Sequence, residues 1–239
     1  MKAVWDEVGK RLYETGTSKG MLYPQVEGRY PKGVPWNGLI SFTESPDGGE
    51  ATDYYADDIK YVSIRSRENF KGTIGAYMYP DEFAECNGEA ALVAGVRIGQ
   101  QVRKPFGFCY TTKIGNDTQF EDFGYKIHIV YGATAAPSEK NYETVNDNSE
   151  PVELNWEIDT LPVAVTGYKP TAHLEIESTA FTTDELKARL TALEDILYGT
   201  DPVEGTNTGT DPRLPLPDEI KSILSGTTTP AEDPEEEET

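Results

Sequence analysis

The segment Ile127-His128-Ile129-Val130-Tyr131 alternates in part between apolar and polar side chains, as a β-strand with two different faces does. The same alternation runs through Tyr61-Val62-Ser63-Ile64-Arg65 and His173-Leu174-Glu175-Ile176-Glu177. Segments rich in β-branched and aromatic residues are also predicted to be strands: Gly33–Phe42, Phe70–Tyr79, Phe106–Ile114, Tyr125–Tyr131, Val152–Ile158, Pro162–Val165 and Thr171–Ser178. Turn signals such as Pro46-Asp47-Gly48-Gly49 separate them. About eight strands with regular turns predict a mainly β fold, a sandwich or barrel.

One helix is predicted after the strands, over residues 182–198. Thr182 and Glu185 have the spacing of a capping box, which marks a helix start, and Gly199 is placed to end the helix. Leucines repeat at intervals that put them on one face: Leu186, Leu190, Leu193 and Leu197. A helix of this length is too short for a lone coiled coil, so we expect it to flank the β-domain.

The C-terminal residues 199–239 differ in composition from the rest of the chain. They hold 11 of the 42 acidic residues and 6 of the 16 prolines, but only two of the 21 basic residues. Such a segment buries too little apolar surface to offset its ordering entropy, so we expect residues 227–239 not to pack. The sequence therefore divides into a β-domain over residues 1–199, with an N-terminal arm, and an acidic Pro/Thr-rich arm over residues 200–239.

An apolar island interrupts this arm and predicts a short helix near residues 217–225. Pro217 suits the first helical position, and acidic residues follow it. The apolar side chains of the island have a reason to be buried: Leu214, Leu216, Ile220 and Leu224. We expect them to dock on the same chain or on a neighbouring copy.

The net charge of −21 disfavours two classes of partner. Binding to nucleic acid through a basic patch needs clustered cations, and attraction to anionic lipid needs them too. No apolar run is long enough for a transmembrane helix. The N-terminus carries Asp6 and Glu7 where a secretory signal would be apolar. We therefore expect no membrane association and a protein made in a cytoplasm.

The sequence contains no specific catalytic or metal-binding motif. His128 and His173 each lie in a predicted strand, and Cys86 and Cys109 are expected to be free, buried or half-buried thiols. The acidic groups Asp53, Asp57 and Asp58, and separately Asp147 with Glu150, match no dedicated calcium loop and are typical of turns. We predict no catalytic residue, no cofactor and no metal site.

Several segments, in order along the chain, resemble the major tail tube proteins of long-tailed, non-contractile (siphovirus-type) bacteriophages. The likeness covers about residues 20–224 and is carried by these stretches: Gly33-Val34-Pro35-Trp36-Asn37-Gly38-Leu39, Thr43 to Thr52, Tyr55 to Tyr61, Tyr79 to Cys86, Ile98 to Gln101, Ile114 to Asp117, Gly124 to Ala133, Ala136 to Lys140, Val145 to Asp147, Ala192 to Gly199 and Pro212 to Ile220. Collinear coverage of this extent is more specific than any single motif.

The resemblance implies a β-sandwich with a helix at its side, a structural virion protein and not an enzyme. Members of that family assemble as hexameric rings that stack into a tail tube, the conduit for DNA ejection. The implied partners are further copies of the chain, the tape measure protein, the tail terminator and the distal tail protein. Viral DNA would pass through an acidic lumen without specific binding. The implied location is the phage tail, after assembly in the host cytoplasm.

The loop expected over Glu44–Asp58 is long for a hairpin connection, and loops of such length tend to be functional or disordered. It contains flexible glycines and two tyrosines of a kind favoured at interfaces. The resemblance implies that it reaches the next ring. The predicted stacking residues are Asp47, Gly48, Gly49, Tyr54 and Tyr55.

Two other functions stay open on the residues alone. A monomeric β-sandwich could bind carbohydrate or protein through exposed aromatic side chains. An acidic hydrolase could use two carboxylates, although the sequence singles out no pair.

Overall fold

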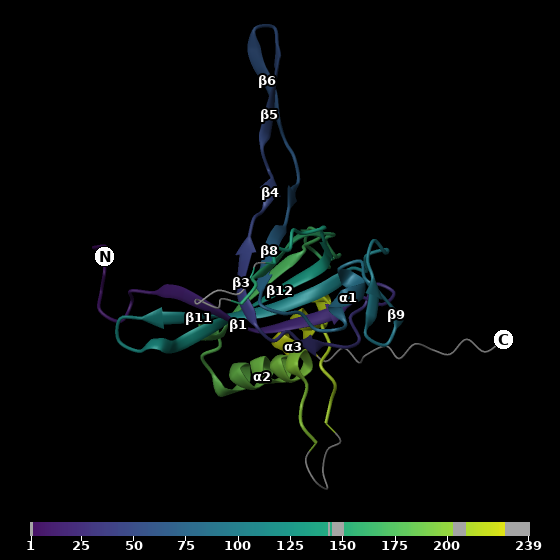
Figure 1. Ribbon diagram of the computed structural model, residues 1–239. Coiled ribbons are helices and arrows are strands. Elements are labelled where there is room, and N and C mark those ends of the chain that lie inside the picture. The colour runs from purple at the N-terminus through teal and green to yellow at the C-terminus, as the bar shows by residue number, and fades with distance from the viewer. Residues whose placement is uncertain (1, 143, 145–150, 203–208, 228–239) are drawn as a thin grey trace, which may run out of the picture.

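The computed structural model describes residues 2–142, 144, 151–202 and 209–227 (Figure 1). Two predictions fall outside these ranges: the turn with Asp147 and Glu150, and the lack of packing over residues 228–239. Among the described residues, no helix combines the length and the hydropathy that crossing a membrane requires.

An eight-stranded antiparallel sheet forms the body, so the chain is mainly β, as the sequence predicts. The strand order is β2-β1-β11-β12-β13-β8-β3, and β14 also pairs with β12. The bounds of these strands are β1 Tyr13–Pro24, β2 Val34–Pro35, β3 Leu39–Glu44, β8 Lys71–Ala76, β11 Phe106–Asn116, β12 Phe120–Ala135, β13 Leu154–Thr160 and β14 His173–Glu177. Residues Pro162–Val165, expected to form a strand, contribute one isolated bridge from Val163 to Thr171.

The sheet curls until its two edges approach each other. Strands β2 and β3 lie at opposite ends of the strand order, although residues 36–38 alone separate them in the chain. A connection of this length spans at most about 14 Å. At the closure, the Trp36 amide donates to the Gly20 carbonyl at 2.7 Å, and Gly38 has a φ of 79°. The single strand expected over Gly33–Phe42 is therefore split at this turn.

Alternate residues of the central strands enter two cores, one on each face of the sheet. The inner core, within the curl, includes Leu22, Trp36, Phe108, Val130 and Trp156. The outer core includes Tyr23, Cys109, Ile129, Leu193 and Ile220. Cys86 and Cys109 are both free and buried, and burial raises the pKa of each thiol to about 12. Neither thiol is therefore ionised at neutral pH.

Two helices cover the outer face of the sheet (Figure 1). Helix α2 (Asp184–Tyr198) buries Leu190, Leu193 and Leu197, and α3 (Pro217–Ser225) lies beside it. The cap of α2 is Thr183, not Thr182, because the Thr183 hydroxyl accepts from the Leu186 amide at 3.3 Å. The Glu185 carboxylate, which a capping box would direct to the start of the helix, forms an ion pair with Arg189 at 2.5 Å.

Smaller elements complete the body. Helix α1 (Phe83–Cys86) buries Phe83 in the inner core. It is followed by a short two-stranded hairpin of β9 (Ala90–Val93) and β10 (Val96–Ile98), and a single 3-10 turn, η1 (Ser178–Ala180), leads from β14 towards α2.

A long two-stranded hairpin projects from the body, and we call residues 45–70 the projecting hairpin (Figure 1). Its strands are β4 (Asp47–Gly48), β5 (Ala51–Ala56), β6 (Ile59–Arg65) and β7 (Glu68–Asn69); β4 pairs with β7, and β5 with β6. Asp57 and Asp58 form the tip with φ values of 50° and 60°, as a two-residue hairpin turn requires.

The sequence prediction for this region was wrong in two respects. It placed a loop over Glu44–Asp58, which instead contains β4 and β5, and it counted the strand Tyr61–Arg65 among those of the sandwich or barrel. Strand β6 instead pairs with β5 and stays outside the main sheet. Alternation marks a strand with two different faces, but it does not tell whether the apolar face meets the chain's own core.

Candidate assembly surfaces

The projecting hairpin exposes an unusual amount of apolar surface for a thin element. Its exposed large side chains are Tyr54, Tyr55, Ile59, Tyr61, Val62 and Ile64. Tyr54 lies opposite Val62, and Thr52 lies opposite Ile64, so these four side chains share one face of the ladder. An isolated two-stranded hairpin is at best marginally stable in water, and contiguous exposed apolar surface marks interaction sites. This element therefore has the properties of a docking arm.

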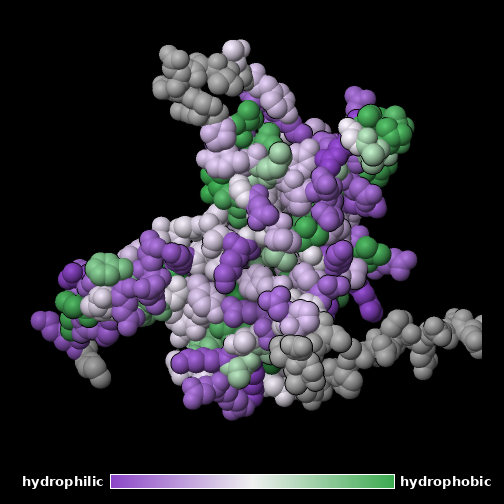
Figure 2. Space-filling model, turned by 60° about the horizontal axis from the view of Figure 1, so that its bottom comes forward, coloured by the Kyte–Doolittle hydropathy of each residue, from purple (hydrophilic) through white to green (hydrophobic). Residues whose placement is uncertain are grey.

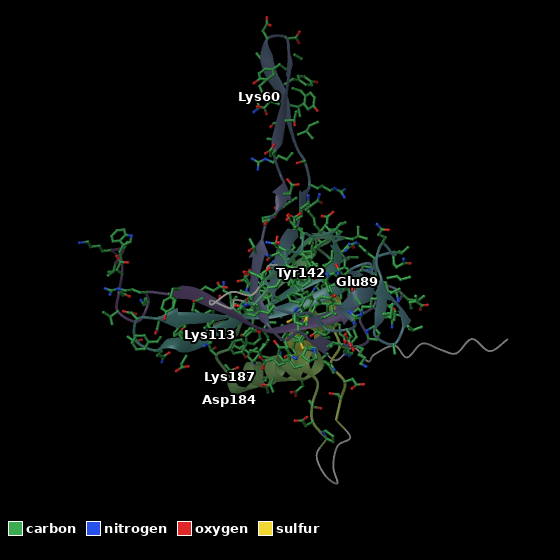
Figure 3. All side chains as sticks on the ribbon, viewed as in Figure 1. Lys60, Glu89, Lys113, Tyr142, Asp184 and Lys187 are labelled. Carbon is green, nitrogen blue, oxygen red and sulfur yellow. The ribbon has the colours of Figure 1, made fainter. Side chains whose placement is uncertain are left out.

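Two exposed ion pairs connect the two sides of the hairpin, one near its tip and one at its base. Lys60, near the tip (Figure 3), contacts Asp53 at 2.7 Å, and Lys71, at the base, contacts Asp47 at 3.0 Å. The hydrogen bond from each lysine holds the pKa of its aspartate below the ordinary value. Exposed pairs of this kind contribute little to stability.

Gly48 is required at the base of the hairpin. Its φ is 91°, and a Cβ atom at this position would lie 2.3 Å from the Arg67 carbonyl oxygen. Gly49 has a φ of 75°, but nothing lies within 4 Å of its hypothetical Cβ. The chain therefore needs glycine at position 48 for both conformation and space, and at position 49 for conformation alone.

The five predicted stacking residues do not form one cluster. Asp47, Gly48 and Gly49 lie at the base of the hairpin, whereas Tyr54 and Tyr55 lie in β5, which runs to the tip. The side chains with the chemistry of an interface are therefore the tyrosines and their apolar neighbours on β6.

The four predicted docking residues of the C-terminal island all belong to the outer core of their own chain. Leu214 and Ile220 are buried, with 3% and 4% of their surface exposed, and Leu216 and Leu224 are half-buried against the same core. The Leu214 amide donates to the Tyr30 carbonyl at 3.1 Å. Residues 209–227 thus close over the outer face of the sheet.

Polar contacts hold this segment at both ends of α3. The Asp218 carboxylate, in its first turn, accepts from the Thr166 hydroxyl at 2.7 Å and from the Thr166 amide at 3.0 Å. The hydrogen bond from the Thr166 hydroxyl lowers the pKa of Asp218 most, and the bond from the Thr166 amide lowers it further. At the C-terminal end, the Arg189 guanidinium donates to the Leu224 carbonyl at 3.2 Å.

Two further parts of the body expose apolar side chains. In the N-terminal segment, Val4, Trp5 and Val8 are exposed, and the Gly9 amide donates to the Asp117 carboxylate at 2.8 Å. The β9–β10 hairpin exposes a second set: Leu92, Val93, Val96 and Ile98. Figure 2 shows apolar surface on the projection at its right, the side on which Figure 1 places β9. Exposed apolar surface is therefore spread over well-separated projections.

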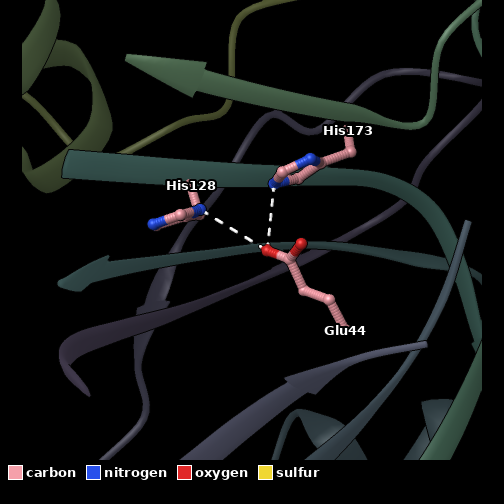
Figure 4. Close-up of side chains that lie close together, drawn as sticks. All are labelled: Glu44, His128 and His173. Carbon is pink, nitrogen blue, oxygen red and sulfur yellow. Dashed lines mark ion pairs between the residues drawn. The ribbon is translucent and has the colours of Figure 1, made fainter. Parts of the chain in front are cut away.

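One polar cluster at the root of the projecting hairpin was not predicted from the sequence. Glu44, the last residue of β3, lies beside His128 of β12 and His173 of β14 (Figure 4). Each histidine alone is an ordinary strand residue, and their pairing depends on the β12–β14 register. No spacing in the sequence signals this juxtaposition.

No family model matches the chain, and no curated protein matches it. Among solved structures, it is similar to a chain of the sixfold-symmetrised baseplate of the anti-feeding prophage, with 4% identity, 74% of this chain and 97% of that chain covered, and a TM-score of 0.34. A chain of that prophage's tube-terminating cap gives 10% identity, 74% and 96% coverage, and a TM-score of 0.32. A chain of the sheath/tube terminator of an extracellular contractile injection system has 12% identity and a TM-score of 0.30. The match covers 73% of this chain and 99% of that chain. TM-scores this low do not support a conclusion about function.

Proposed function

We propose that this chain is a structural subunit of a phage tail tube, which forms hexameric rings that stack into a conduit for DNA. The observation that carries the proposal is the projecting hairpin, whose ladder exposes tyrosine, isoleucine and valine side chains far from either core. A next ring that covers this surface would remove it from water, at about 25 cal/mol per Å² of apolar area buried.

The sequence resemblance supports the same proposal independently. It runs in order through residues 20–224 and includes both Thr43–Thr52 and Tyr55–Tyr61, which form most of the projecting hairpin. In the family that the chain resembles, the matching loop reaches the neighbouring ring. The exposed surface therefore lies where that family has its inter-ring contact.

Several exposed projections fit a subunit that has neighbours in more than one direction. The projecting hairpin, the N-terminal segment and the β9–β10 hairpin point away from the body in different directions (Figure 1). A subunit in a stacked ring needs a lateral interface, which closes the ring, and an axial one, which extends the tube. We assign the projecting hairpin to the axial interface.

The strong negative charge suits passage of DNA through the lumen. With 42 acidic and 21 basic residues, a wall of such subunits repels phosphate and gives DNA few cations to bind. We propose that DNA passes without specific contacts, and that the tape measure, tail terminator and distal tail proteins meet the tube in the virion.

Electron microscopy of the concentrated protein, negatively stained, tests the proposal. We expect rings with sixfold symmetry and striated tubes of stacked rings. Particles of single chains at every concentration would contradict it and would favour the monomeric binding module. Saccharide-dependent changes in tyrosine or tryptophan fluorescence would support that alternative further.

A further inference from the structure

We propose that Glu44, His128 and His173 form a binding site for a divalent transition-metal ion of the Zn²⁺ type. One oxygen or nitrogen atom from each of the three residues lies within 4.8 Å of the other two (Figure 4). Glu44 Oε1 lies 3.6 Å from His128 Nδ1 and 3.5 Å from His173 Nε2. Ligands at Zn²⁺ distances of 2.0–2.1 Å in a tetrahedron lie about 3.3–3.4 Å apart. Both separations from the carboxylate oxygen are therefore within about 0.3 Å of the ligand spacing in a tetrahedral site.

Two of the three ligand atoms are buried without a hydrogen-bond partner among the described residues. These atoms are His128 Nδ1 and His173 Nε2, and the His128 residue is only 5% exposed. A buried polar atom that is left unsatisfied destabilises the fold, so such atoms call for an explanation. A bound ion would satisfy both of them at once.

The opposite nitrogen of His128 already has the partners that a metal-binding histidine requires. His128 Nε2 lies 3.0 Å from the Thr112 hydroxyl and 3.4 Å from Glu14 Oε1. A proton on Nε2, donated to these oxygens, leaves the lone pair of Nδ1 directed towards the site. Tyr110 orients the carboxylate in the same way, because its hydroxyl donates to Glu44 Oε1 at 2.6 Å.

Stacked aromatic rings hold the two imidazoles in place. His173 stacks on Phe70 with ring centroids 4.6 Å apart, and His128 stacks on Tyr110, also at 4.6 Å. The two imidazoles lie between these partners, 5.7 Å from each other. Their positions are thus set by packing, so little conformational freedom remains to be lost on ion binding.

Two of the three proposed ligands, Glu44 and His128, border a pocket. This pocket of about 370 Å³ lies beside the cluster, lined by residues that include Glu14, Glu44 and His128. Three protein ligands leave one position of a tetrahedral ion for water. Imidazole nitrogens favour Zn²⁺ and its transition-metal neighbours over Mg²⁺ and Ca²⁺, which prefer oxygen ligands.

The position of the site gives the ion a structural role. Glu44 ends β3 immediately before the projecting hairpin, whereas the histidines lie on β12 and β14, which are not neighbours of β3 in the sheet. A bound ion would therefore cross-link the root of the hairpin to the middle of the sheet. This inference is independent of the proposed assembly, because it concerns a single chain.

The test is a titration of the full-length, chelator-treated protein with Zn²⁺ in excess Mg²⁺, which occupies the many exposed carboxylates. We expect one Zn²⁺ per chain by calorimetry, and a rise in melting temperature. The chain has only two histidines, so imidazole ¹⁵N signals report directly on the site, and both should shift. Co²⁺ in place of Zn²⁺ should give the visible absorption of a four- or five-coordinate ion.

Variants separate this site from general binding to acidic groups. Glu44→Gln and His173→Gln each remove one ligand and should weaken Zn²⁺ binding more than the loss of a supporting residue does, which is about 10–100-fold. Glu121→Gln is the control. Glu121 lies on β12, as His128 does, but it is exposed and pairs with Lys113 of β11. Unmoved imidazole signals in the wild type would overturn the proposal, even if the variants fail to fold. Zn²⁺ binding by His173→Gln with wild-type affinity would overturn it too.

Discussion

Tyr54 lies directly opposite Val62 in the β5–β6 ladder, yet these side chains remain 51% and 41% exposed. A cross-strand pair of this kind stabilises a hairpin by about 0.2–1 kcal/mol. This stabilisation is small compared with the free-energy cost of leaving the apolar surface of the pair exposed to water. This exposure fits the proposal that another copy of the chain covers the pair.

The first prediction concerns this surface. Tyr54→Ser should lower the free energy of unfolding of the single chain by no more than about 1 kcal/mol, because the ring belongs to neither core and loses only its cross-strand pair. It should nevertheless reduce tube formation, measured as the pelleted fraction after ultracentrifugation. Thr52→Ser on the same face is the control, and should pellet as the wild type does. Equal pelleting of all three proteins would remove Tyr54 from the interface.

The second prediction separates two glycines at the base of the hairpin. Gly48→Ala should disrupt the β4–β7 pairing, because its Cβ would meet the Arg67 carbonyl at 2.3 Å. Gly49→Ala adds no such contact and should cost about 1 kcal/mol for the left-handed conformation alone. Hydrogen exchange of the backbone amides that pair β4 with β7 measures the difference. Equal protection in the two variants would contradict the assigned close approach.

The third prediction concerns the docked C-terminal segment. Ile220→Ala should lower the free energy of unfolding by about 2–5 kcal/mol, because Ile220 is buried in the outer core. Lys187→Ala on the exposed side of α2 (Figure 3) should change it by less than about 0.5 kcal/mol. Thermal unfolding of the two variants gives the comparison. An Ile220→Ala protein as stable as the control would mean that α3 is not held by this core.

The fourth prediction is a dependence of stability on pH through Asp218. The pKa of this carboxyl is held below its ordinary value of 3.8 by the Thr166 hydroxyl. The ionised carboxylate therefore contributes its full stabilisation above that value, and the contribution is lost as the pH falls through the lowered pKa of the folded state. Asp218→Asn should lose stability at neutral pH and show a smaller further decrease in acid. Parallel curves for the two proteins, measured as melting temperature against pH, would contradict this assignment.

Much of the body follows from local patterns in the sequence. Alternation in Ile127–Tyr131 and His173–Glu177 predicts two strands that the structure contains. The leucine spacing of residues 186–197 predicts a helix on the sheet, and Leu190, Leu193 and Leu197 are its buried residues. These features are predictable because each depends on burial of one face of a single element.

Features that depend on relations between elements are not predictable in this way. The alternation in Tyr61–Arg65 indicates a strand, but it does not reveal that its partner is β5, outside the body. Glu44 and His128 are far apart in sequence, and their contact depends on the curl that brings β3 over β12. The helix cap differs by one residue because Thr182 and Thr183 offer the same hydroxyl, and the backbone conformation selects Thr183.

The central claim is that the projecting hairpin joins one ring to the next, and a shortened hairpin tests it most directly. The Ser66 amide donates to the Glu50 carbonyl at 3.0 Å, so a short Gly-Ser turn can replace residues 51–65 without leaving either strand half-paired. The measurement is tube length in negatively stained micrographs, on protein shown to be folded by circular dichroism. We predict long striated tubes from the wild type and, from the variant, single rings or free chains. Tubes of wild-type length from the folded variant would contradict the account.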